Sequence, residues 1–119
     1  LKEKEGINYL GFVHDMTSVY SKCNVLLFPS IYREGVPRVI IESLKHGLTI
    51  VTRNMPGCKE TVRHNGFLIT EESSAQDIID YLLSLDSVKL LENYKYSLEL
   101  FENVFSSKVI YPQYFELTI

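Results

Sequence analysis

The sequence is poor in cysteine, has little net charge and contains no long apolar run. Its two cysteines, Cys23 and Cys58, stand far apart, so no C-x-x-C pair and no Cys/His spacing typical of a zinc site is present. A formal net charge of −3 provides no basic footprint for nucleic acid or anionic lipid. No apolar run approaches the roughly 20 residues of a membrane-spanning helix. These absences favour a cytoplasmic domain with reduced thiols and no nucleic-acid partner.

The remaining composition is typical of a packed globular domain. Hydrophobic residues make up 45% of the chain and charged residues 23%. A chain of 119 residues is long enough to bury one core but too short for two independent cores. We therefore predict a single domain over residues 1–119. Because the chain starts at Leu1 rather than Met and enters a strand-like segment almost at once, we expect this domain to be part of a longer protein.

Strand-like apolar runs alternate with helical patterns through residue 70. The predicted strands cover residues 7–13, 25–28, 49–52 and 66–70. The run at 25–28 is continuously apolar, as expected of a strand covered on both faces. Between the strands, the sequence predicts a helix after Asp15, a helix over 37–46 that stops at Gly47, and a short helix over 60–62. This alternation predicts an α/β fold with a Rossmann-like parallel sheet flanked by helices.

Two more helices are predicted from Ser74 and from Ser87, and the aromatic-rich end of the chain is compatible with a third, bent or started at Pro112. Apolar residues recur at helical spacing in all these segments. In the helix after Asp15 they are Met16, Val19, Tyr20 and Cys23. In the later helices they are Ala75, Ile78, Ile79, Leu82 and Leu85, and then Val88, Leu91, Leu98 and Phe105. We assign these stripes to the core.

The residues best suited to chemistry lie in the turn between the second predicted strand and the following helix. In open α/β sheets, ligands bind at the carboxyl ends of strands, and the free amides of a helix N-terminus suit a phosphate or a polar sugar. Gly35 allows close approach of the backbone to a ligand. Glu34 precedes the helix, whereas Glu42 lies more than one turn inside it, on the face of Arg38. These two carboxylates can accept hydrogen bonds from different hydroxyls of one extended ligand.

The same residues also have a plainer interpretation. Arg38 and Glu42 stand four residues apart, which is the spacing of an ordinary surface salt bridge on a helix. Glu34 is then a solvated loop residue without a ligand. Composition and spacing alone favour this plainer interpretation.

The stretch PSIYREGVPRVIIES resembles the E-x7-E signature of family-4 retaining glycosyltransferases with the GT-B fold. Glu34 and Glu42 are the two glutamates at that spacing. The resemblance covers most of residues 7–70 and includes GFV at 11–13, Gly47, MPGCKETV at 55–62 and NGFLI at 65–69. It implies a partial C-terminal half of a GT-B fold, with the acceptor-binding N-terminal domain absent from this sequence. The subgroup most similar to this stretch builds lipid-linked oligosaccharides and surface polysaccharides.

The resemblance also implies roles for individual residues. Glu34 contacts the donor sugar and is assigned as catalytic, and Glu42 contacts the ribose of the nucleotide. The turn residues implied to hold donor hydroxyls or phosphate are Gly35, Val36, Pro37 and Arg38. Main-chain groups near Phe12 and Val13 are implied to meet the uracil. The glycine-containing turn whose basic residues grip the diphosphate in this family is absent here, so diphosphate binding by this chain alone should be impaired.

The implied reaction is transfer of an N-acetylhexosamine or a hexose from a UDP-sugar, with retention of configuration, to a glycan or lipid-linked acceptor. The resemblance implies no metal and no other cofactor, because helix dipole and basic side chains neutralise the leaving group in this fold. The missing domain is expected to bind the acceptor and to make any contact with the inner face of the membrane. The chain alone is expected to be inactive.

Two rival functions stay open on the sequence. A UDP-sugar epimerase with the GT-B fold shares the sheet and the nucleotide pocket, and a non-catalytic nucleotide-binding module needs no acceptor. No general base is assigned among His14, His46 and His64, which are far apart in the sequence and lack a metal-ligand spacing. Cys58 has no visible activating partner and is interpreted as an inert thiol.

Overall fold

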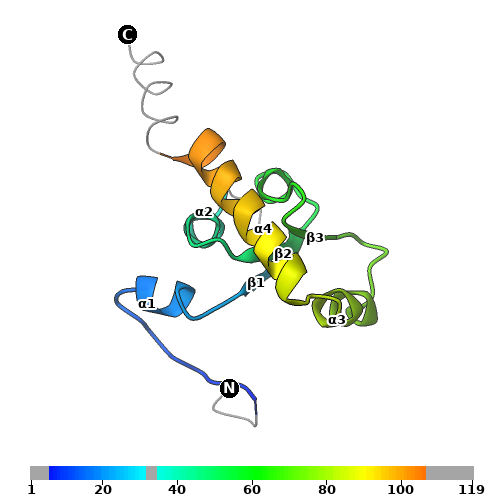
Figure 1. Ribbon diagram of the computed structural model, residues 1–119. Coiled ribbons are helices and arrows are strands. Elements are labelled where there is room, and N and C mark those ends of the chain that lie inside the picture. The colour runs from blue at the N-terminus through cyan, green and yellow to red at the C-terminus, as the bar shows by residue number, and fades with distance from the viewer. Residues whose placement is uncertain (1–5, 32–34, 107–119) are drawn as a thin grey trace.

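The computed structural model describes residues 6–31 and 35–106, and these form a parallel sheet with helices packed around it (Figure 1). The elements in chain order are α1 (Thr17–Tyr20), β1 (Val25–Phe28), α2 (Arg38–Lys45), β2 (Thr49–Arg53), η1 (Lys59–Thr61), β3 (Gly66–Ile69), α3 (Ala75–Leu83), α4 (Ser87–Leu100) and the π-helical turn η2 (Phe101–Phe105). The described strands lie in the order β1-β2-β3, and both pairs are parallel. The predicted α/β, Rossmann-like arrangement is therefore confirmed.

Burial differs between the strands of this sheet. In β2, residues 49–52 are all buried, as expected of a strand covered on both faces. In β1, by contrast, the side chain of Leu27 is 50% exposed. The prediction of full cover at 25–28 is wrong, because within the described residues β1 is an edge strand whose only sheet neighbour is β2.

The strand predicted at 7–13 is also wrong. Ile7 makes an isolated bridge, and residues 8–13 are irregular. This segment runs away from the sheet (Figure 1), and Phe12 is 92% exposed. A strand forms only where a neighbouring strand satisfies its backbone amides and carbonyls, and no strand of the described residues pairs with this segment beyond that bridge.

The helix predicted after Asp15 forms but spans only Thr17–Tyr20. Asp15 was predicted as the N-cap, but the cap position is Met16, and Asp15 lies one residue earlier, where its Oδ1 accepts a hydrogen bond from the amide of Thr17 at 3.0 Å. Tyr20 is buried, in line with its predicted place in the core. Cys23 is exposed, and its predicted burial is wrong because the helix ends before reaching it.

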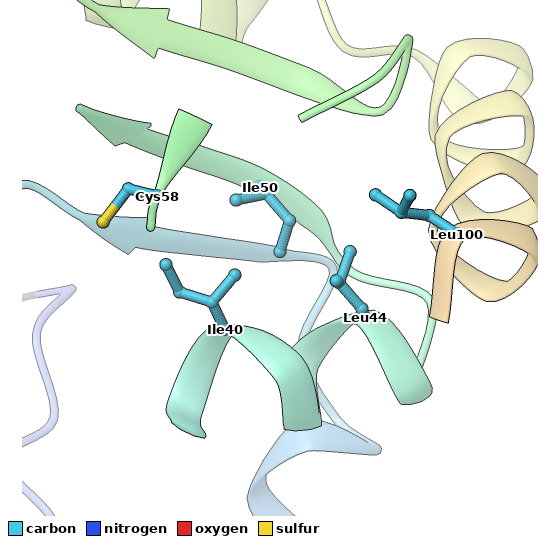
Figure 2. Packing of buried hydrophobic residues seen from close by; sticks show 5 residues of the cluster. All are labelled: Ile40, Leu44, Ile50, Cys58 and Leu100. Carbon is cyan, nitrogen blue, oxygen red and sulfur yellow. The ribbon is translucent and has the colours of Figure 1, made fainter. Parts of the chain in front are cut away.

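α2 begins after Pro37 and is followed by Gly47, close to the predicted limits. Gly47 has a φ of +76°, the left-handed conformation that ends a helix at little cost for glycine. The inner face of α2 carries Ile40 and Leu44, both fully buried. Figure 2 shows these side chains pointing toward Ile50 of β2 and toward Leu100 at the end of α4. This cluster fixes α2 against the sheet and so determines where the outer face of α2 lies.

Replacing Leu44 with alanine should destabilise the fold more than any surface change. The removed side chain is fully buried, so Leu44→Ala leaves a cavity and should lower the free energy of unfolding by about 2–5 kcal/mol. The matched control is Leu83→Ala, because Leu83 of α3 is 81% exposed. This substitution should lower the free energy of unfolding by less than about 0.5 kcal/mol. Urea titration followed by circular dichroism measures both values, and equal losses would contradict the assigned core.

α4 packs on the sheet through polar side chains, which the apolar pattern did not predict. Asn93 and Ser97 are both fully buried. The Nδ2 of Asn93 donates to Oγ1 of Thr49 at 3.0 Å, and the hydroxyl of Ser97 donates to the carbonyl of Leu48 at 2.7 Å. The Nδ2 of Asn65 donates in turn to the hydroxyl of Ser97 at 3.0 Å. Buried polar groups are tolerated where they find such partners.

The apolar stripes predicted for α3 and α4 are therefore only partly correct. The stripe residues that are exposed are Ala75, Ile79, Val88 and Leu91, and those that are half-buried are Ile78, Leu82, Leu85, Leu98 and Phe105. The predicted start of α3 is confirmed, since Ser74 and Asp77 form a reciprocal capping box. The predicted final helix falls in residues 107–119, outside the described residues.

Candidate functional site

The segment between β1 and α2 is described except for residues 32–34. Tyr32, Arg33 and Glu34 lie outside the described residues, so the catalytic assignment of Glu34 stays a prediction. Gly35 is exposed, and Val36 and Pro37 are half-buried where the chain enters α2. This entry follows the carboxyl end of β1, which is where open α/β sheets bind ligands.

A polar hollow of about 430 Å³ lies between α1 and α2, and we call it the α1–α2 hollow. Its lining residues are His14, Asp15, Met16, Thr17, Tyr20, Arg38, Glu42, Lys45 and His46. The wall from α2 consists of side chains on the outer face of that helix, opposite the buried Ile40 and Leu44. The hollow thus joins two carboxylates, two cationic side chains and two imidazoles from segments that are separate in the sequence.

Among the charged residues of this hollow, Glu42 is partly buried and forms an ion pair. Its Oε1 accepts a hydrogen bond from Nε of Arg38 at 2.8 Å, so the surface salt bridge foreseen from the spacing does form. The two side chains differ in exposure, at 92% for Arg38 and 33% for Glu42. An ion pair with one member in open solvent contributes little to stability. The pair therefore leaves Glu42 available as an acceptor that faces the hollow.

Tyr20 lies beside Glu42 and comes from the opposite wall. Its ring packs against the imidazole of His46, with ring centroids 5.3 Å apart. Burial raises the pKa of Tyr20 to about 12, and the neighbouring Glu42 carboxylate adds to the rise. The His46 Nδ1 lies 2.9 Å from the backbone carbonyl of Glu42 and donates to it when protonated. Tyr20, His46 and Glu42 thus form one connected group.

Asp15 supplies the second carboxylate of the hollow. The hydrogen bond from the amide of Thr17 holds the pKa of Asp15 below its usual value, so this side chain is ionised at neutral pH. Phe12 and Val13, implied to meet the uracil, precede this wall but do not line the hollow, whereas His14 and Asp15 do. Asp15 was not predicted as a site residue, because its position before a helix had been attributed to capping.

Chemically, the α1–α2 hollow is equipped to bind a polar, hydroxyl-rich ligand. Carboxylates accept hydrogen bonds from adjacent hydroxyls, and bonds to a charged acceptor are the stronger kind. Within residues 6–31 and 35–106, no group of three or more histidine, cysteine or acidic side chains is arranged to hold a metal ion. In the same part of the chain, no helix is long and apolar enough to cross a membrane.

Comparison with known proteins gives consistent matches. Residues 1–87 match the sequence model of a family described as glycosyl transferases group 1. A protein of Haemophilus influenzae named as an uncharacterized glycosyltransferase is 33% identical over 79 residues, which cover 64% of this chain and 22% of that protein. The N,N'-diacetylbacillosaminyl-diphospho-undecaprenol alpha-1,3-N-acetylgalactosaminyltransferase of Campylobacter jejuni is 29% identical over 109 residues, which cover 90% of this chain and 27% of that protein. The chain thus spans about a quarter of the length of these curated relatives.

Proposed function

Because this chain belongs to the glycosyl transferases group 1 family, we propose that it is the donor-binding part of a retaining glycosyltransferase. The donor is a UDP-sugar carrying an N-acetylhexosamine or a hexose, and the acceptor is a glycan or a lipid-linked sugar. Support for the N-acetylhexosamine and for the lipid-linked acceptor comes from the Campylobacter jejuni relative, whose name includes an N-acetylgalactosaminyl group and a diphospho-undecaprenol. The acceptor binds to a part of the protein outside this chain, in the cytoplasm at the inner face of the membrane.

The observation that carries the proposal is the Glu42 carboxylate in the α1–α2 hollow. It is partly shielded from solvent and faces a polar space large enough to admit part of a nucleotide. In the proposed complex, Glu42 accepts hydrogen bonds from the ribose hydroxyls. The uracil then lies toward the segment from Phe12 to Asp15, whose main-chain groups form hydrogen bonds with the edge of the base.

The sugar and phosphates lie nearer to the start of α2. The exposed backbone at Gly35 and the amides that open α2 face the donor, and the positive end of the helix dipole stabilises the negative charge of the departing diphosphate. In this proposal Glu34 contacts the hexose and fixes its reacting carbon, and no metal ion takes part. Basic groups from outside this chain complete the diphosphate site.

A donor panel with the full-length protein tests this function. We expect transfer from UDP-N-acetylhexosamine or a related UDP-sugar only when a lipid-linked acceptor is present, with the anomeric configuration of the donor retained in the product. Nuclear magnetic resonance of the product gives its anomeric configuration, and the same measurement on the remaining donor shows whether its sugar has changed. An altered donor sugar in the absence of acceptor would instead identify an epimerase, and nucleotide binding without any turnover would identify a binding module.

A further inference from the structure

The Glu42 carboxylate has a second neighbour besides Arg38. Tyr20 of α1 lines the α1–α2 hollow together with Glu42, and the Glu42 carboxylate contributes to the raised pKa of Tyr20. Tyr20 is only 5% exposed, so its ring has little freedom, and the His46 imidazole packs against it. Glu42 is therefore flanked by one partner in open solvent and one partner fixed in the interior.

These two partners differ in how well they can orient a carboxylate. The Arg38 side chain is 92% exposed, and a long exposed cation is screened by water and exchanges between rotamers. A tyrosine side chain rotates about only two angles, so packing of its buried ring also fixes the position of its hydroxyl. The phenol stays a hydrogen-bond donor throughout the physiological range, because the pKa of Tyr20 is raised to about 12.

We propose that Tyr20 is a positioning residue, whose hydroxyl holds the Glu42 carboxylate toward the hollow in the orientation that receives the ribose. This inference rests on the proposed function of Glu42. Through Tyr20, α1 contributes to donor binding without contacting the sugar. The His46 ring acts one step further away, because it packs on Tyr20 and lies against the backbone carbonyl of Glu42.

The test uses the full-length protein and titration with UDP. Tyr20→Phe keeps the buried ring and removes only the hydroxyl, so it should weaken UDP binding about threefold to tenfold, in the lower part of the range of couplings between contacting residues. The value of kcat at saturating donor should not change, since the ribose is remote from the reacting carbon. In a Glu42→Ala background, Tyr20→Phe should have no further effect. The matched control is Tyr96→Phe, because Tyr96 packs on His64 at a similar centroid distance of 5.4 Å and does not line the α1–α2 hollow.

The outcomes separate this inference from the proposed function. If Glu42→Ala weakens UDP binding and Tyr20→Phe does not, the positioning role is wrong and the function of Glu42 stands. Equal losses from Tyr20→Phe with and without Glu42 would also overturn it, because Tyr20 would then act independently. If Glu42→Ala leaves UDP binding unchanged, the proposed function itself fails. If Tyr20→Phe fails to fold, His46→Leu replaces it in the test. We expect His46→Leu to cause a smaller loss of UDP affinity, which again disappears in the Glu42→Ala background. An unchanged affinity in His46→Leu would contradict the inference.

Discussion

Glu34→Gln in the full-length protein is expected to lower kcat about a hundredfold, with UDP affinity and melting temperature nearly unchanged. The substitution keeps the size of the side chain and one acceptor oxygen, and it removes the charge. If Glu34 holds the donor hexose, its loss lets the reacting carbon drift, and a misplacement of about 1 Å can cost on the order of a hundredfold in rate. The sequence predicts that Glu34 lies in a loop, where a carboxylate adds little to folding stability, so the fold should survive.

Steady-state kinetics measures kcat, a UDP titration measures the affinity, and a thermal melt measures the melting temperature. Glu71→Gln is the matched control, because Glu71 is an exposed glutamate in the turn before α3 and lies outside the α1–α2 hollow. Turnover at the wild-type rate in Glu34→Gln would remove this residue from the site. A strongly lowered melting temperature would show instead that its role is structural.

Glu42→Ala should act on binding rather than on turnover. Loss of a charge-assisted hydrogen bond to the ribose corresponds to about 1.5–3 kcal/mol, which raises the Kd for UDP about 10- to 100-fold. Because the ribose contact is the same in the ground state and the transition state, KM for the donor should rise by far more than kcat falls.

The control for Glu42 is another glutamate of a helical ion pair. Glu92 of α4 lies 3.7 Å from Nζ of Lys89, on a helix that does not line the α1–α2 hollow. Glu92→Ala should leave the Kd for UDP and the KM unchanged. If Glu42→Ala behaves like Glu92→Ala, then Glu42 is only a partner of Arg38 on the surface, and the ribose assignment is wrong.

Local sequence signals predicted the elements that hold the site. β1 follows from a continuous apolar run and β2 from a short β-prone stretch, and the limits of α2 follow from Pro37 before the helix and Gly47 after it. Each of these signals acts within a few residues along the chain. The Arg38–Glu42 pair was foreseen for the same reason, since its geometry depends on one turn of helix.

Contacts between distant segments were not predictable in this way. The buried face of α4 depends on partners of Asn93 and Ser97 that lie 44 and 49 residues earlier in the chain. Tyr20 was correctly assigned to the core, but its place beside Glu42 is a tertiary contact between two helices. The strand at 7–13 failed because a β-prone segment becomes a strand only when a neighbouring strand pairs with it.

A structure of the full-length protein with UDP bound tests the proposed donor site most directly. We expect the ribose to occupy the α1–α2 hollow, with at least one of its hydroxyls within about 3 Å of a Glu42 carboxylate oxygen, the usual length of such a hydrogen bond. UDP bound elsewhere, with Glu42 still paired to Arg38 and the hollow unoccupied, would contradict the assignment of this chain's donor site.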